Sequence, residues 1–277
     1  MPAIEESGLL IKDQVTKWRF NNQIKMLNKA KAYCEKNKIS IKQVSFKLLC
    51  PLLDYAGMEE NEKLQEHWAI LLGNLVDSEQ NIENHVFPYI LSQISVNEFQ
   101  VTEKIYNKRQ VRVERLQLEL NEFRTQNSAK IQTIRDKIES YQNELKKLKD
   151  SGMKIYSDGY TKVKLEKDKA EKELWLLTYK ERTLLNAIER SEEYNSGELG
   201  NYEFSNLIRL GVAKEVSEIH NDSASTLEIP NLHPDHDEYK SHTNVDLDIS
   251  MSLSVEIVLT ELGELFMRAC KEKTTVK

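Results

Sequence analysis

ENEKLQEHWAILLGNLVD, residues 60–77, begins with charged residues and becomes strongly apolar around a tryptophan. Its apolar residues recur at intervals of three and four, which is the spacing of one face of an α-helix. That face carries Leu64, Trp68, Leu71, Leu72, Leu75 and Val76. We therefore expect a core helix with Trp68 as its largest buried side chain, and a functional groove is the alternative use of the same face.

The composition indicates a mainly helical chain. Only 9 of the 277 residues are glycine and 5 are proline, so few residues interrupt helices. No run of about 18 uncharged apolar residues is present, and the segment MPAIEESGLL lacks the basic and long apolar parts of a signal peptide. The odd number of widely spaced cysteines, Cys34, Cys50 and Cys270, is typical of a reducing compartment. We expect a cytoplasmic protein without a membrane segment.

The first 97 residues are predicted to form a helical bundle. The predicted helices cover residues 7–37, 44–56, 60–77 and 85–94. Pro51 should kink the second helix or begin a new one, because it removes a backbone donor and clashes one turn back. Four helices with short connections can bury one core.

Residues 98–197 are predicted to form a long antiparallel coiled-coil hairpin. The sequence SVNE, residues 95–98, has the capping-box pattern that begins a helix. Two series of apolar residues at heptad spacing follow, separated by DSGMKIYSDG at 150–159. A helix of about 50 residues is about 75 Å long, so the hairpin should project. The alternative is a long helix that pairs with a second chain.

Residues 198–277 are predicted to form a small winged-helix-like α+β module. The pattern predicts a helix within 202–215 that is ended by Gly211, a strand over 255–260 and a final helix over 260–273. Between them, the polar and acidic residues 217–254 are predicted to be an irregular insertion.

No pattern in the chain predicts catalysis. The sequence lacks G-x-S-x-G, H-E-x-x-H, P-loop and G-x-G-x-x-G motifs, so we expect no enzyme, no catalytic residue and no cofactor. One histidine cluster, HPDHDEYKSH, contains His233, His236 and His242. A metal site needs ligands on a rigid frame, which this loop does not offer, so we expect no metal site.

The charge distribution disfavours nucleic acid as the partner. Residues 1–97 carry a net charge of −1, residues 98–197 carry +3 and residues 198–277 carry −8. Proteins bind phosphate backbones mainly through lysine and arginine, and the candidate helix offers only Arg209 and Lys214. The acidic module is therefore expected to pack on its own chain or on a protein partner.

Two ordered segments carry a resemblance to a known family. KWRFNNQIKMLNKAKAYCEKNKI at 17–39 and VSFKLLCPLLDYAGMEENEKLQEHWAILLGNLVD at 44–77 resemble the Abi-alpha family of bacterial abortive-infection proteins. The resemblance extends over about 18–125 and 200–270, through HVFPYILSQIS, NLIRLGVAKE and LTELGELFMRAC. We place the family-motif core at Trp18, Pro51, Leu64, Trp68, Leu71, Leu72 and Leu75.

The resemblance implies phage defence, in which an infected cell stops growing before phage release. It implies no reaction and no catalytic residues. We expect a defence protein that acts through protein–protein contacts, with a protein partner or a second copy of the chain, and with a phage component as one candidate. The alternatives are a winged-helix DNA-binding regulator and a toxin-like effector with an unrecognised activity.

Overall fold

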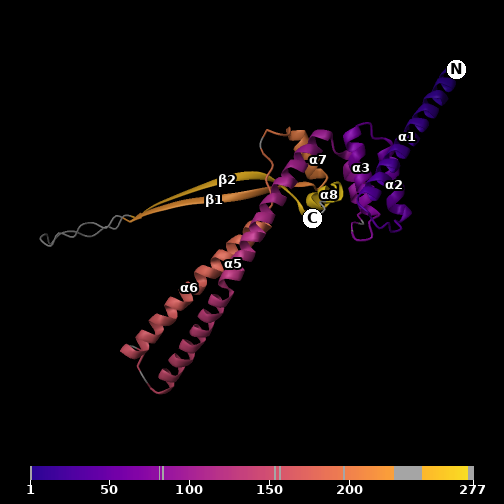
Figure 1. Ribbon diagram of the computed structural model, residues 1–277. Helices are drawn as coiled ribbons and strands as arrows, with labels where there is room; N and C mark the ends of the chain where they lie inside the picture. The colour runs from indigo at the N-terminus through magenta and orange to yellow at the C-terminus, as the bar shows by residue number, and fades with distance from the viewer. Residues whose placement is uncertain are drawn as a thin grey trace. The chain divides into compact units, whose positions relative to one another are not determined.

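The computed structural model of the protein describes residues 2–80, 82, 84–152, 154–155, 157–195, 197–227 and 245–273. The chain forms two compact units (Figure 1). One unit joins Met1–Ile105 with Glu193–Lys277, and the other is Tyr106–Glu192. The first and last parts of the chain therefore belong to one unit.

The first unit begins with four helices that pack together (Figure 1). They are α1 (Pro2–Lys36), α2 (Phe46–Gly57), α3 (Glu62–Leu75) and α4 (Val86–Gln93). The four predicted helices are therefore confirmed, with ends that shift by a few residues. Pro51 lies inside α2, which continues past it, whereas Pro88 lies in the first turn of α4, where a missing backbone donor costs little.

The core of this unit contains most of the family-motif residues. Leu64, Trp68, Leu71, Leu72 and Leu75 are all buried, as the helical stripe predicts.

Two family-motif residues do not belong to the core. Trp18 is 37% exposed, whereas Asn22, one turn later in α1, is buried and donates from its side chain to the Gly57 carbonyl. Pro51 is also exposed, on the face of α2 that carries Cys50 and Asp54. The expectation that Trp18 and Pro51 are core residues is therefore wrong.

Helix α5 (Val96–Asp150) begins with the predicted capping box. The Ser95 amide donates to Glu98 Oε2 at 2.6 Å, and the Glu98 amide donates to Ser95 Oγ at 3.2 Å. The same carboxylate accepts from the Asn206 side chain at 3.0 Å, so the cap also holds α7 (Asn201–Arg209).

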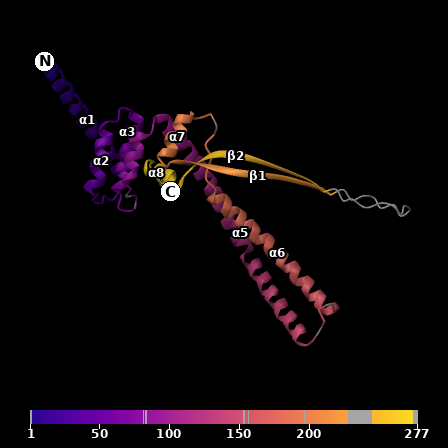
Figure 2. The ribbon, with the colours of Figure 1, turned by 180° about the vertical axis from the view of Figure 1, so that it is seen from behind.

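The last part of the chain contains a long antiparallel pair of strands. β1 (Ala213–Leu227) pairs with β2 (Val245–Leu259), in a register that runs from Ala213↔Leu259 to Leu227↔Val245. The two strands lie side by side in Figures 1 and 2. Helix α7 ends at Arg209, close to the predicted stop at Gly211, and Gly211, at φ +73°, allows the chain to turn into β1.

The prediction of an irregular segment over 217–254 is wrong for 217–227 and 245–254, which are strand. The acidic composition concealed an alternation of apolar residues, which predicts a strand. The alternating residues are Leu247, Ile249, Met251, Leu253, Val255 and Ile257. The proposed histidine cluster, at 233–242, lies outside the described residues.

Helix α8 (Glu261–Ala269) packs into the N-terminal bundle. The ring of Phe266 lies 6.1 Å from the ring of Phe87 in α4 and 6.1 Å from the ring of Phe99 in α5. Phe266 is fully buried, so the core of the first unit is shared by both ends of the chain.

The second unit is a helical hairpin of α5 and α6 (Asp158–Glu189). Ion pairs join Arg124 to Glu181 and Lys130 to Glu173, so the helices run antiparallel within one chain, as Figures 1 and 2 show. The hairpin core is formed by Leu120, Phe123 and Leu184, with Leu116, Leu177, Leu185 and Ile188 packed around them.

Candidate functional site

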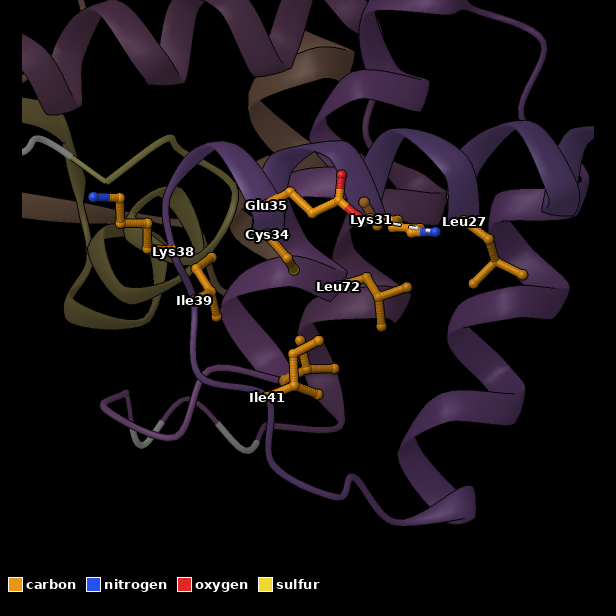
Figure 3. Close-up of a pocket in the computed structure, with 10 residues that line it drawn as sticks. Leu27, Lys31, Cys34, Glu35, Lys38, Ile39, Ile41 and Leu72 are labelled. Carbon is orange, nitrogen blue, oxygen red and sulfur yellow. Dashed lines mark ion pairs between the residues drawn. The ribbon is translucent and has the colours of Figure 1, made fainter.

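The N-terminal bundle contains an open apolar groove of about 540 Å³ between α1, the α1–α2 connection and the end of α3 (Figure 3). The residues that line it are Leu27, Ala30, Lys31, Cys34, Glu35, Lys38, Ile39, Ile41, Leu72 and Val76. Leu27 is 42% exposed and Ile41 is 70% exposed, so the groove presents apolar side chains to solvent.

The end of α1 forms one side of the groove through a specific backbone turn. The Ile39 amide donates to the Cys34 carbonyl at 2.9 Å, and the Lys38 amide donates to the Glu35 carbonyl at 3.2 Å. This is the Schellman pattern, in which the residue after the helix adopts a left-handed conformation. Lys38 does so with φ at +52°, although glycine is the usual residue there. The turn brings Ile39 back beside Cys34.

The α1–α2 connection is held against the end of α3 by backbone hydrogen bonds. The Lys42 amide donates to the Val76 carbonyl at 2.7 Å, and the Ser78 amide donates to the Ser40 carbonyl at 2.8 Å. Ile41 lies between these two bonds and pairs with Asp77 as an isolated antiparallel bridge. The backbone therefore fixes Ile41 as a wall of the groove.

Helices α1 and α3, which both line the groove, approach each other closely at Gly73. A Cβ atom at Gly73 would lie 2.4 Å from the Cδ1 atom of Tyr33 and 3.6 Å from the sulfur of Cys34. Only glycine leaves room for this packing, because real Cβ contacts are not as short as the first of these.

A buried polar network lies beside the groove and fixes the C-terminal segment. The side chain of Asn74 donates to the carbonyls of Ala269 and Lys271, both at 2.9 Å, and accepts from the hydroxyl of Tyr33 at 3.0 Å. The same hydroxyl accepts from the Lys273 amide at 3.1 Å. Asn74 is 1% exposed, so these bonds satisfy polar groups that water does not reach.

In the same segment, the partly exposed ammonium group of Lys273 forms an ion pair with the buried carboxylate of Asp77. Burial alone would raise the pKa of Asp77, but hydrogen bonds from Lys273, the Glu79 amide and Gln80 outweigh it and lower that pKa. The hydrogen bond with Asp77 raises the pKa of Lys273. Both groups are therefore charged at neutral pH, and they close the network.

The thiol of Cys34 lines the groove. Burial, together with the charges of Asp77 and Glu35, raises the pKa of the Cys34 thiol, so the reactive thiolate is disfavoured at neutral pH. The rim residues Lys31 and Glu35 face each other at 3.9 Å (Figure 3). The arrangement suits binding of an apolar surface framed by charge.

Metal and membrane features are not found in the described part of the chain. In the ranges given above, no three or more His, Cys, Asp or Glu side chains gather as a metal ion would need. None of the helices in those ranges has the length and apolar character to cross a membrane.

The sequence predicted the helix that supports the groove but not the groove itself. Of the family-motif residues, Leu72 lines it, while Leu64, Trp68, Leu71 and Leu75 lie in the core. The walls that sequence reasoning missed are Leu27, Ile39 and Ile41. The alternating isoleucines of the NKISIK connection were the available signal.

The sequence that forms these helices and this core matches one family of known proteins. A family model described as abortive infection alpha matches residues 19–270, which is most of the chain. The chain belongs to the Abi-alpha family. The matched range of this Abi-alpha protein includes the groove, the hairpin and α8. No curated protein and no solved structure matches it.

Proposed function

We propose that this Abi-alpha protein is a cytoplasmic, non-enzymatic phage-defence protein that acts by binding a protein partner in the apolar groove. The family connects the chain with abortive infection, and the groove supplies the surface for contact. The observation that carries the proposal is the exposure of Leu27 and Ile41 over a buried apolar floor that includes Ala30 and Leu72.

An amphipathic helix of the partner fits the groove best. Such helices insert a few apolar side chains into a groove and keep their polar face in water. The rim carries two lysines, Lys31 and Lys38, against the single carboxylate of Glu35. This charge favours a partner helix with acidic residues beside its apolar face.

The two other function classes have less support. In a winged-helix DNA-binding module, a basic helix would contact phosphates, whereas Arg209 of α7 already donates to Tyr89 and Asn206. The net charge of −8 over 198–277 also opposes binding to a duplex. A toxin-like effector would need a reactive group. The thiol of Cys34 in the groove is a poor candidate, because its raised pKa disfavours the reactive thiolate.

Phage plating and the survival of infected cells test the proposal. We expect fewer plaques in cells that carry the protein, together with death or arrest of the infected cells. Growth arrest on expression without phage would favour the effector instead. A shift of duplex DNA at near-physiological salt concentration would favour the regulator.

A double variant, Leu27→Glu with Ile41→Glu, tests the groove. It places charges on two exposed apolar walls, so it should abolish defence with little loss of stability. Phe46→Glu is the matched control, because Phe46 is 76% exposed in the same bundle but does not line the groove. Full defence by the double variant would contradict the groove as the contact site.

A further inference from the structure

The outer face of α6 carries large apolar side chains in contact with solvent. Trp175 is 59% exposed, Leu176 is 52% exposed and Tyr179 is 56% exposed. The rings of Trp175 and Tyr179 stack with centroids 5.1 Å apart. Exposed apolar groups of this size, close together on one helix face, are typical of a contact surface.

Trp175 and Tyr179 belong to a second heptad series on α6, which we name the Trp175 face. Its members are Leu165, Asp168, Lys172, Trp175, Tyr179, Arg182 and Asn186, and all of them are exposed. Their spacing alternates between three and four, as in a helix that packs along another helix. The face lies opposite to the hairpin core, because Trp175 and Leu184 are nine residues apart, about 180° around the helix.

The charges on the Trp175 face are arranged symmetrically. Asp168 and Arg182 lie seven residues before and after Trp175. Within the part of the chain that the structure describes, neither residue forms a salt bridge or a side-chain hydrogen bond. The neighbouring glutamates Glu173 and Glu181 are already paired with Lys130 and Arg124 of α5.

We propose that the Trp175 face binds the Trp175 face of a second copy of this chain, with the two α6 helices antiparallel and a two-fold axis at Trp175. Asp168 of one copy then lies level with Arg182 of the second copy, about 10.5 Å from the axis. Two-fold symmetry forms this ion pair twice.

The remaining residues of the face also suit the antiparallel arrangement. Lys172 lies within one residue, about 1.5 Å along the helix axis, of the level of Tyr179 of the second copy, where an ammonium group can rest on an aromatic ring. A parallel arrangement would instead place Asp168 against Asp168 and Arg182 against Arg182, which is repulsive. The charge pattern therefore selects a second copy in one orientation. The proposed dimer contact uses none of the groove residues, so the dimer and the groove proposals can be refuted independently.

Single charge reversals in the full-length protein test the proposal. In a dimer of the Asp168→Arg variant, two positive charges face each other at both symmetric ion-pair positions. In a dimer of the Arg182→Asp variant, two negative charges face each other there. Each should raise the dissociation constant of the dimer about tenfold, measured by analytical ultracentrifugation. Trp175→Ala should raise it by about thirtyfold or more, because it removes the central aromatic residue.

Mixing the two single variants gives the decisive result. One copy with Asp168→Arg and one copy with Arg182→Asp form two favourable pairs, so the mixture should form a heterodimer. The double variant Asp168→Arg with Arg182→Asp should also recover the wild-type dissociation constant. Both recoveries need the antiparallel pairing of these two positions, and neither depends on phage defence.

Leu118→Glu is the matched control, because Leu118 is 66% exposed on α5 of the same hairpin. It should leave the dimer unchanged, and circular dichroism should show the same helix content for every variant. A monomeric wild-type protein at concentrations of tens of micromolar would overturn the proposal. A dimer that survives Trp175→Ala, or single variants that do not recover on mixing, would also overturn it.

Discussion

Replacing Asn74 by alanine should lower the free energy of unfolding by about 3–4 kcal/mol. The Asn74 side chain makes two hydrogen bonds of 2.9 Å to the carbonyls of Ala269 and Lys271 and one of 3.0 Å with the hydroxyl of Tyr33. Each contributes about 1 kcal/mol, and the buried partners left without a bond add a further cost. Asn74→Asp keeps the shape of the side chain but replaces its donor with an acceptor.

The aspartate would face two carbonyl oxygens, so Asn74→Asp should be less stable than Asn74→Ala at neutral pH and should partly recover as the pH falls. Urea unfolding followed by circular dichroism measures both variants. Asn121→Ala, which changes an exposed asparagine of α5, should shift the free energy of unfolding by less than about 0.5 kcal/mol. A loss below about 1 kcal/mol for Asn74→Ala would refute the buried network, as would equal losses for the two Asn74 variants.

Lys38→Gly should stabilise the protein by about 1 kcal/mol in urea unfolding, because glycine adopts the left-handed conformation at φ +52° without the steric cost that lysine bears; an unchanged midpoint would contradict the turn at the end of α1. Gly73→Ala should destabilise the protein, because overpacking at a 2.4 Å contact costs about 1–3 kcal/mol and outweighs a gain of about 1 kcal/mol in helix propensity; a higher melting temperature would contradict the close approach of α1 and α3. The stabilisation from the lowered pKa of Asp77 is present above its unfolded-state pKa of about 3.9 and is lost as the pH falls through the folded-state value. The stabilisation from the raised pKa of Lys273 is present below its unfolded-state pKa of about 10.4 and is lost as the pH rises through the folded-state value. The difference in melting temperature between the wild type and Lys273→Met should therefore shrink at both pH extremes, and a constant difference from pH 3 to pH 11 would argue against the ion pair.

The helices were predictable because their residues carry a local signal. Apolar spacing predicted α1 to α4, and the capping box at Ser95 and Glu98 marked the start of α5. The heptad series on both sides of Gly152 predicted the hairpin of α5 and α6, whose seam contains Leu120 and Leu184.

The long strands were missed for a different reason. The acidic composition of 217–254 outweighed the alternation that begins at Leu247, so a strand pair was predicted as an irregular insertion. Composition alone is a weak predictor of a strand in a β-hairpin. The strands pair through backbone hydrogen bonds, which polar and acidic residues also form.

The groove and the polar network could not be predicted from local patterns. Asn74 lies off the apolar stripe of α3, yet it is 1% exposed because the C-terminal segment covers it. The groove joins Leu27 and Ile41 with Leu72, residues that only the folded chain brings together. Trp18 shows the converse, since a residue placed in the family-motif core is 37% exposed in the folded chain.

The survival of infected cells after a synchronous phage infection tests the central claim most directly. Cells that express the wild-type protein or the Phe46→Glu control should lose viability after infection while phage yield falls. Cells that express the Leu27→Glu and Ile41→Glu double variant, at the same protein level, should release phage as cells without the protein do. Equal phage yield and equal cell survival for the double variant and the wild type would contradict defence through the groove.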